Sequence, residues 1–479
     1  MNVLFASAEM SPLAKVGGLG DVAGSLPLAL RNLGHDVRVV LPLYAIVDRS
    51  RAGARPIAEI QVRDGESARL WLADVRGVPV YLVESPHYFD RPTVYGHDDD
   101  ADRFLFFCDA ILAATAVFDF TPDVIHAQDW HTGLLLTRLA ANPGHPWAAR
   151  GRVFTIHNLA LKGPFDDAFV ERAGINRAQL APPDGLAPDM MYSGMAQGIM
   201  HADRVNTVSD TYAREILTPE YGAGLDPLLR ARANALSGIV NGIDYDEFNP
   251  ETDPAIHANY SVESLDRRVE NKRALQRTAG LPEDDGALLF GVVTRLFAQK
   301  GIDLVPDALE PLLAARGAQL VVLGTGDEDV HQMLLKLETR HPSKVNVWLD
   351  FNPPLGQQIY AGCDVFLMPS RYEPCGLGQL ISLRYGAVPL VRRTGGLADT
   401  VTDADDALTT GTGFVFEHAT SDDLAGAVQR AIDAFTNRPG WRAMQQRGMR
   451  QDWSWGRAAQ KYAALYERAI SDRSAAGVA

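Results

Sequence analysis

The sequence has few cysteines, no long apolar run and no excess of cationic residues. Each of these absences argues against one class of protein. Its three cysteines, Cys108, Cys363 and Cys375, have no metal-ligand spacing, so a reducing cytosol is the expected compartment. No run of about 18 apolar residues occurs, so no membrane-spanning segment is expected. The formal net charge of −15 argues against non-specific nucleic-acid binding, because such binding needs a cationic surface.

The sequence is rich instead in apolar, strand-like runs that alternate with helical segments. With 479 residues, two or three domains are expected. The first run follows no basic region and is expected to be a strand and not a signal peptide. The alternation predicts an α/β protein with parallel, doubly wound sheets. Strands are expected at residues 2–8, 36–42, 69–75, 78–83, 124–126, 152–157, 204–209, 287–293, 318–323, 345–349, 365–368 and 388–391, and helices at 19–33, 104–118, 133–141, 211–217, 268–279, 303–315, 355–361, 421–436 and 457–469.

One stretch, NGIDYDEFNPETDP at residues 241–254, is the best candidate for a linker because it is rich in turn formers and acids. The strand–helix alternation starts again after it. We therefore expect one domain at residues 1–240, a second at 241–455, and a helix with its tail at 456–479. Ligand sites are expected where the parallel strands reach their carboxyl ends.

Two turns of the second domain join a strand to a helix and carry glycine or charge. Glu373, Cys375 and Gly376 follow one strand, and the turn at residues 394–396 follows the next, after Arg392 and Arg393. Helix N-termini suit anions, since their N–H groups are free and the dipole is positive there. Both turns could equally be ordinary strand–helix connections.

Two cations, Arg295 and Lys300, stand at the end of another strand of this domain, in TRLFAQKGID. Such a pair can bind pyrophosphate. Solvent-exposed basic residues of a loop would give the same pattern.

The first domain has its own glycine motif, KVGGLGD at residues 15–21. Glycines let the backbone approach a ligand, and Lys15 supplies charge for phosphate. The sequence Gly18-x-Gly20-x-x-Ala23 formally matches a dinucleotide fingerprint, but the strand ends near Ala8, too early for the tight turn. A Rossmann dehydrogenase is therefore not favoured, and no P-loop motif occurs.

Two further motifs, HAQDWH at residues 126–131 and TIHN at residues 155–158, place polar groups just past apolar strands. Functional residues are common there, although a capping Asp129 or a structural histidine would look the same. His126 and His131 lack the i, i+4 spacing of helical zinc ligands.

These motifs together resemble the bacterial glycogen synthase and plant starch synthase family. The resemblance covers residues 1–466 and rests on KVGGLGDV, HAQDWHT, HNLALKGPF, TPEYGAGLDPLL, IVNGID, TRLFAQKGIDLV, LGTGD, MPSRYEPCGLGQL and RYGAVPLVRRTGGLADTV. It implies a GT-B glycosyltransferase, with two Rossmann-like domains facing a deep cleft and a C-terminal helix that crosses back to the first domain.

The reaction that the resemblance implies is retaining transfer of glucose from ADP-glucose to the non-reducing 4-OH of an α-1,4-glucan such as glycogen. It uses no cofactor and no catalytic metal. Two rivals remain: the same fold acting with UDP-glucose or on a small acceptor such as glucose-1-phosphate, and an inactive glucan-binding protein. The second is disfavoured because Arg295, Lys300 and Glu373 are all present.

The resemblance also implies roles for single residues. Arg295 and Lys300 would neutralise the leaving diphosphate, and Glu373 would hold the region of the glucose 3-OH. Because that role makes Glu373 a hydroxyl ligand and not a nucleophile, we expect a front-face reaction in which the leaving phosphate takes the acceptor proton. The other implied contacts are His157 near the glucose 6-OH, Asp129 at glucose hydroxyls with Asn158 nearby, Cys375 and Gly376 beside Glu373, Lys15, Gly17, Gly18, Thr394, Gly395 and Gly396 at the donor phosphates, and Tyr95 and Asp21 on the acceptor side.

Overall fold

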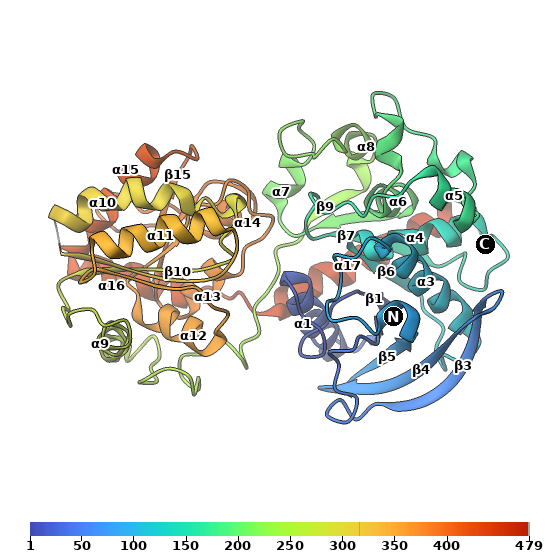
Figure 1. Cartoon of the computed structure of the whole chain (residues 1–479), viewed down its shortest axis with the longest axis horizontal. Coiled ribbons are helices and arrows are strands. Elements are labelled where there is room, and N and C mark those ends of the chain that lie inside the picture. Colours follow the sequence, from blue (N-terminus) through green and yellow to red (C-terminus); the bar gives the residue numbers. More distant parts are fainter. Residues whose placement is uncertain (316, 478–479) are drawn as a thin grey trace. The chain divides into compact units, whose positions relative to one another are not determined.

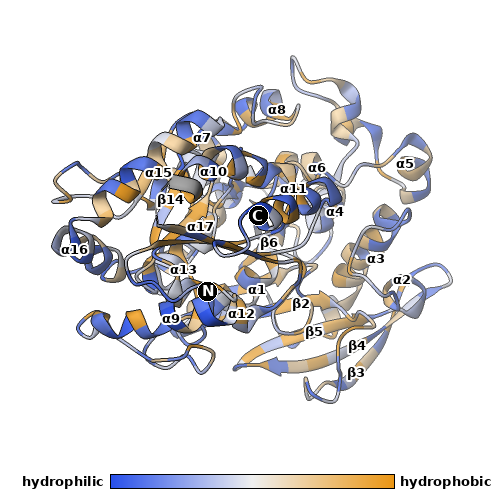
Figure 2. Ribbon diagram, turned by 60° about the vertical axis from the view of Figure 1, so that its left-hand side comes forward, coloured by the Kyte–Doolittle hydropathy of each residue, from blue (hydrophilic) through white to orange (hydrophobic). Residues whose placement is uncertain are grey.

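The computed structural model describes residues 1–315 and 317–477 and divides the chain into two compact units (Figure 1). Unit 1 consists of Met1–Asn241 together with Trp455–Ala479, and unit 2 consists of Gly242–Ser454. The chain therefore leaves unit 1 at Asn241 and returns to it at Trp455. In Figure 2, hydrophobic residues run along strands such as β2 and β5, while helices such as α3 and α9 mix hydrophobic and hydrophilic residues.

Unit 1 is built on a nine-stranded sheet whose order is β3-β4-β5-β2-β1-β6-β7-β8-β9. All neighbours are parallel except β3–β4 and β4–β5, which are antiparallel. The strand order reverses between β1 and β6, and such a reversal is where α/β sheets bind ligands. The strands are β1 (Asn2–Ala6), β2 (Asp36–Pro42), β3 (Arg55–Arg63), β4 (Glu66–Val75), β5 (Val78–Glu84), β6 (Val124–Gln128), β7 (Gly151–Ile156), β8 (Arg204–Thr207) and β9 (Leu236–Gly238).

Helices cover both faces of this sheet, which explains why its central strands are mostly buried along their length and do not alternate between buried and exposed residues. β6, for example, is buried at every position. The helices are α1 (Gly18–Asn32), α2 (Pro86–Phe89), α3 (Asp100–Ala113), α4 (Asp129–Ala141), α5 (Asp167–Ala173), α6 (Gly194–His201), α7 (Asp210–Glu215), α8 (Asp226–Ala231) and α17 (Trp455–Ala475), with 3₁₀ turns at Ala114–Ala116, Arg177–Leu180, Pro188–Met191 and Ala233–Ala235.

The last helix of unit 1, α17, is held to the sheet by buried polar contacts as well as by apolar packing. Nδ1 of His126 lies 2.9 Å from the hydroxyl of Tyr466, and Nε2 lies 2.7 Å from Oγ1 of Thr155. Asn206 donates to the hydroxyl of Tyr462 at 2.9 Å. Burial holds the pKa of His126 well below its usual range, so its imidazole is neutral. His126, a candidate for function by its position after a strand, therefore has a structural role.

Unit 2 contains a six-stranded parallel sheet in the order β12-β11-β10-β13-β14-β15. Counted from β10 this is the Rossmann order 3-2-1-4-5-6, and it reverses between β10 and β13. The strands are β10 (Leu288–Val293), β11 (Ala318–Leu323), β12 (Val345–Trp348), β13 (Val365–Met368), β14 (Val388–Arg392) and β15 (Phe414–Phe416). The helices are α9 (Arg268–Thr278), α10 (Val305–Ala315), α11 (Glu328–Arg340), α12 (Pro353–Gly362), α13 (Gly378–Arg384), α14 (Gly395–Thr400), α15 (Ser421–Phe435) and α16 (Arg438–Met449), with 3₁₀ turns at Leu265–Arg267, Ala298–Lys300 and Ile302–Leu304.

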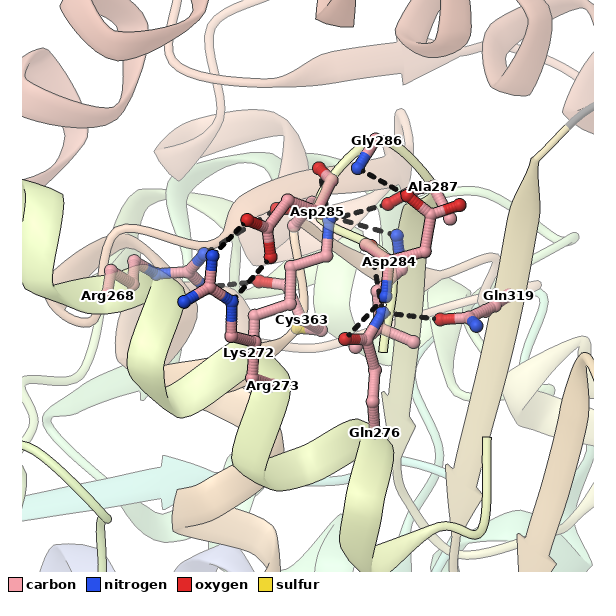
Figure 3. Close-up of polar contacts among 12 residues, drawn as sticks. Arg268, Lys272, Arg273, Gln276, Asp284, Asp285, Gly286, Ala287, Gln319 and Cys363 are labelled. Atoms are coloured by element: carbon pink, nitrogen blue, oxygen red, sulfur yellow. Dashed lines mark hydrogen bonds and ion pairs between the residues drawn. The ribbon is translucent and has the colours of Figure 1, made fainter. Parts of the chain in front are cut away.

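The buried Lys272 fixes α9 to the amino-terminal edge of this sheet, where it contacts Asp285 and Ala287 (Figure 3). Nζ of Lys272 lies 2.7 Å from Oδ2 of Asp364 and also donates to the carbonyls of Asp285 and Ala287 at 3.2 and 2.5 Å. The same carboxylate oxygen accepts the backbone N–H of Leu289 at 3.0 Å. All three ammonium protons are therefore used, and the residues just before β10 are bonded to α9.

The stretch at residues 241–254 is packed and does not form a loose linker. Its acids and amides accept backbone N–H groups of their own turns: Asp244 from Asp246, and Asn249 from Glu251. Asp253 is 2% exposed and accepts the hydroxyl of Tyr385 at 2.6 Å. The turn formers that suggested a linker are thus the means by which this segment folds onto unit 2.

Candidate functional site

In unit 2, the turns that follow β10 and β13 meet at the point where the strand order reverses. Nζ of Lys300, from the first turn, lies 2.6 Å from Oε2 of Glu373, from the second. Their side chains are 15% and 7% exposed. Oγ of Ser370 donates to the same carboxylate oxygen at 3.0 Å. A cation and a carboxylate are therefore held together, largely out of solvent, where a Rossmann sheet binds its ligand.

The backbones of these two turns are also bonded to each other. The side chain of Gln299 donates to the carbonyl of Tyr372 at 3.1 Å, and the N–H of Arg371 donates to the carbonyl of Gln299 at 2.8 Å. Gly301 has φ +64°, and a Cβ there would lie 2.1 Å from the carbonyl oxygen of Pro369. The position of Lys300 against Glu373 is therefore fixed by the backbone as well as by charge.

Three arginines of unit 2 were candidate phosphate ligands, and the structure separates them. Arg295 is exposed, its guanidinium 5.7 Å from the ring of Phe297, and no carboxylate of the described residues lies within ion-pair distance of it. Arg392 is buried and donates to the carbonyls of Ser370, Arg371 and Glu417. Arg393 pairs with the carboxylate of Glu417 at 2.6 Å. Arg392 and Arg393 thus hold β14 to its neighbouring turns, while the guanidinium of Arg295 faces solvent.

The glycine turn before α14 packs against the Glu373 turn. Gly395 has φ +43°, and a Cβ there would lie 2.0 Å from the carbonyl oxygen of Glu373. A Cβ on Gly396 would lie 2.0 Å from the carbonyl oxygen of Cys375. The N–H of Gly396 donates to the carbonyls of Glu373 and Pro374 at 3.1 Å each. These glycines are therefore required for close backbone packing, and the amide of Gly396, a predicted phosphate donor, already has two acceptors.

Two other residues of these turns are buried beside them. Gly376 has φ +72°, which favours glycine, and Gln379 donates to the carbonyls of Cys375 and Gly376 at 3.0 Å each. Thr394 is fully buried. The bonds from Gln379 fix the turn at Cys375 and Gly376, which follows Glu373.

In unit 1, the glycine motif lies after β1 and has space around it. Lys15 pairs with Asp21 at 2.6 Å, so its ammonium already has a counter-ion. No atom lies within 4 Å of a Cβ built on Gly17 or Gly18, and neither has a positive φ. Neither packing nor backbone conformation therefore requires glycine at these two positions, so the space they leave open can admit a ligand.

One residue beside this loop, Glu9, was not predicted from the sequence. It is 2% exposed, and its Oε2 accepts the N–H groups of Val16 and Gly17 at 2.7 and 2.8 Å. Its Oε1 accepts the hydroxyl of Tyr95 at 3.1 Å. Glu9 stands three residues after the end of β1, so the rule that polar residues past parallel strands belong to sites would have found it.

Asp129 begins α4 in a left-handed conformation, with φ +54°. This conformation is costly for a residue with a side chain and is found mostly at functional sites. Its Oδ1 accepts the N–H of His157 at 2.7 Å. Burial raises the pKa of Asp129 to about 7, against hydrogen bonds from the backbone of His157 and Asn158, which lower it; the charge of Glu9 raises it further. Asp129 thus titrates near neutral pH.

Two histidines of this region are neutral, His131 fully buried and His157 half-buried. Burial lowers the pKa of His157 to about 3, and its Nε2 lies 2.8 Å from Oε1 of Gln128. Burial likewise lowers the pKa of His131 to about 3. The ring of His131 stacks on Trp130, with centroids 3.9 Å apart, and lies 5.2 Å from the ring of Tyr95. His157 thus keeps a fixed place beside Asp129, and His131 lies behind Tyr95.

The structure therefore brings the predicted residues together in two groups, one in each unit. The group in unit 2 is Arg295, Lys300, Glu373, Cys375, Gly376, Thr394, Gly395 and Gly396, and the group in unit 1 is Lys15, Gly17, Gly18, Asp21, Tyr95, Asp129, His157 and Asn158. Among the described residues, no three His, Cys, Asp or Glu side chains are arranged to hold a metal ion. Within the same part of the chain, no helix combines the length and the apolar character needed to span a bilayer.

Comparison with known proteins gives consistent results for both units. The family described as starch synthase catalytic domain matches residues 2–231, and the family described as glycosyl transferases group 1 matches residues 275–439. Proteins named glycogen synthase are similar over nearly their whole length: that of Syntrophotalea carbinolica is 44% identical, covering 98% of this chain and 99% of its own, and that of Moorella thermoacetica is 43% identical, covering 99% and 98%.

A solved structure, the catalytic domain of starch synthase IV from Arabidopsis thaliana bound to ADP and acarbose, has the same fold, with a TM-score of 0.89. It is 34% identical and is matched over 98% of this chain and 99% of its own. The two Rossmann-like units are those of the GT-B fold, and the chain is a hexosyltransferase. The chain belongs to the bacterial glycogen synthase and starch synthase family.

Proposed function

We propose that the enzyme transfers glucose from ADP-glucose to the non-reducing 4-OH of an α-1,4-glucan and that the new bond retains the α configuration. The observation that carries this proposal is the Lys300–Glu373 pair at the strand-order reversal of a Rossmann sheet, with the exposed Arg295 on the turn after β10. The names of the relatives and the ADP and acarbose in the starch synthase structure support the same donor and a glucan acceptor.

We assign the main donor contacts to Arg295, Lys300 and Glu373 of unit 2, further donor contacts to the glycine loop of unit 1, and the acceptor to unit 1 on the side of Tyr95 and Asp21. Arg295 and Lys300 would stabilise the negative charge that develops on the leaving diphosphate, the task that a metal ion performs in many other transferases. Glu373, already bonded to Lys300, would accept hydrogen bonds from glucose hydroxyls. The buried pair holds both groups in position before the donor binds, so little reorganisation is needed during the reaction.

The bond changes follow from this assignment. The bond from C1 of glucose to the diphosphate oxygen breaks, and the acceptor 4-OH oxygen bonds to C1 on the same face. The acceptor proton passes to the departing phosphate oxygen, so no protein carboxylate has to become covalently bound. A glucosyl group trapped on Asp129 or Glu373 would contradict this route.

Transfer of labelled glucose into glycogen tests the function directly. We expect incorporation from ADP-glucose in excess of that from UDP-glucose, and with glycogen in excess of that with glucose-1-phosphate. Preference for UDP-glucose or for the small acceptor would replace the proposal by that alternative. No transfer from either nucleotide sugar by folded protein would contradict the proposed reaction.

The donor-side role of the glycine loop gives a prediction. Gly18→Ala should leave the melting temperature unchanged, since the added methyl meets no atom within 4 Å. It should lower kcat/KM for ADP-glucose about 10-fold or more, because the methyl occupies space that the diphosphate needs. Gly34→Ala is the control at the other end of α1: its φ of +88° predicts lower stability with unchanged kcat/KM. Equal kinetics in wild type and Gly18→Ala would remove this loop from the donor site.

The raised pKa of Asp129 gives a prediction for pH. If the ionised carboxylate binds glucose hydroxyls, kcat/KM should rise with pH to a plateau, with a midpoint near pH 7. The folded chain keeps this proton up to about pH 7 but the unfolded chain loses it near 3.8, so the contribution of Asp129 to stability falls as the pH rises between these values. Asp129→Asn should lower activity and remove both dependences, which kinetics and thermal unfolding at several pH values would measure.

The proposal includes a cytoplasmic location and small-molecule and glucan partners. The three cysteines are free and buried, which suits a reducing compartment. The net charge of −15 does not favour nucleic acid as a partner.

A further inference from the structure

The carboxylate of Glu9 bonds to two different loops of unit 1. One is the loop at residues 15–18, through the N–H groups of Val16 and Gly17, and the other carries Tyr95, through its hydroxyl. We infer that Glu9 is a positioning residue that sets the donor-side loop and makes its position depend on the acceptor-side Tyr95. This inference rests on the proposed function of the two loops.

The loop at residues 15–18 has few other means of support. Lys15, Val16 and Gly18 are exposed, and no atom approaches the Cβ positions of Gly17 and Gly18 within 4 Å. Hydrogen bonds from N–H groups to an ionised carboxylate are roughly twice as strong as neutral ones. Other restraints on this loop are the Lys15–Asp21 pair and the N–H of Gly20, which donates to the carbonyl of Gly17 at 3.1 Å. The two bonds to Oε2 are the ones that hold the amides of Val16 and Gly17.

The carboxylate of Glu9 bonds to N–H and O–H donors and not to a cation. Among the described residues, no Lys, Arg or His lies within ion-pair distance of its carboxylate, although Lys15 is close in sequence. Lys15 pairs instead with Asp21 of α1, at 2.6 Å. An acid that is 2% exposed and unpaired by a cation is costly, and the N–H and O–H donors offset that cost.

The second contact reaches the acceptor side. Tyr95 is half-buried, and its ring lies 5.2 Å from the ring of His131, which is itself packed against Trp130 and Phe104. The phenol is thus held by aromatic packing while its hydroxyl donates to Glu9. A glucan that shifts Tyr95 would shift the carboxylate, and with it the N–H groups that hold the donor-side loop.

Variants of the full chain test this inference, with hydrogen exchange and kinetics as readouts. Glu9→Ala should speed exchange at the amides of Val16 and Gly17 at least 10-fold and lower kcat/KM for ADP-glucose about 100-fold, since a displacement near 1 Å costs about that much. Glu9→Gln keeps an acceptor oxygen for both N–H groups and should recover most of the lost kcat/KM. Glu59→Ala, at an exposed acid of β3, is the control and should match the wild type.

The fourth variant tests the connection to the acceptor side. Tyr95→Phe removes only the hydroxyl and should raise KM for ADP-glucose as well as for glycogen. The effects of Glu9→Ala and Lys15→Ala should be markedly less than additive, because Glu9 acts through the loop that carries Lys15.

The outcomes separate this inference from the proposed function. Loss of stability in Glu9→Ala with unchanged kinetics of the folded enzyme would reduce Glu9 to a structural residue. A higher KM for glycogen alone, with unchanged exchange at Val16 and Gly17, would make it a direct acceptor ligand. Either result contradicts the inference and leaves the reaction intact, whereas absence of transfer by the wild type would contradict the reaction itself.

Discussion

Replacing Lys300 by alanine should lower kcat about 1,000-fold, the loss expected when one charge that stabilises a developing anion is removed. The ammonium of Lys300 is nearly buried against Glu373, so bulk water cannot substitute for it. Binding of ADP should weaken less than kcat falls, because the charge on the leaving group is largest in the transition state. Steady-state kinetics with ADP-glucose and glycogen, together with ADP titration, would measure both.

Two further variants make this result specific. Arg295→Ala should lower kcat about 100-fold or more with an unchanged melting temperature, because its guanidinium is exposed and has no ion-pair partner among the described residues. Lys336→Ala removes an exposed lysine of α11 in the same unit and should leave kcat unchanged. If Lys300→Ala folds and retains more than a tenth of the wild-type kcat, Lys300 does not stabilise the leaving group.

Replacing Lys272 by methionine should destabilise unit 2 by about 3 kcal/mol, the lower end of the cost of breaking a buried ion pair. The loss is not larger because Asp364 would keep the guanidinium of Arg268, whose Nη1 lies 3.9 Å from Oδ1. The side chains of Lys272 and Asp364 are 5% and 8% exposed, so the remaining carboxylate could not be hydrated without opening the sheet edge. Exchange protection of the amides of α9 and β10 in the full chain would report the loss.

The neighbouring pair on the same helix is the control for this prediction. Arg273 and Asp285 are 46% and 47% exposed, and exposed pairs contribute about 0 to 1 kcal/mol, so Arg273→Ala should change stability little (Figure 3). Asp364→Asn should fall between the two, since it keeps an acceptor for the N–H of Leu289 but loses the charge. Equal effects of Lys272→Met and Arg273→Ala would show that burial does not strengthen the first pair.

Much of the secondary structure could be predicted because buried parallel strands are continuous apolar runs. The strand expected at residues 365–368 is β13, and the strands expected at 69–75 and 78–83 are β4 and β5, which pair antiparallel. β3 was missed because it is an edge strand in which Ile60 alone is buried, so it has no apolar pattern. α16 was missed because arginine, glutamine and glycine make up much of it.

The general location of the candidate site could be predicted from where its residues stand in the sequence relative to the strands. Residues that follow parallel strands gather at one edge, so the rule placed Lys300 and Glu373 in the same region without any knowledge of distance. Which cation pairs with which acid could not be predicted, because the partners lie 73 residues apart and the choice depends on how the turns pack. For the same reason Arg392 resembled a phosphate ligand, although its guanidinium bonds to three carbonyls.

The position of α17 has a consequence for synthesis on the ribosome. Unit 1 contains a helix that follows all of unit 2 in the sequence. His126 and Asn206 therefore cannot form their buried hydrogen bonds to Tyr466 and Tyr462 until that helix has been synthesised. At about 5 to 20 residues per second, that wait lasts roughly 10 to 40 s. Unit 2 is continuous and can finish folding first, whereas unit 1 is completed last although it begins the chain. During that interval the apolar face that α17 will cover is open, which makes the nascent chain a substrate for chaperones.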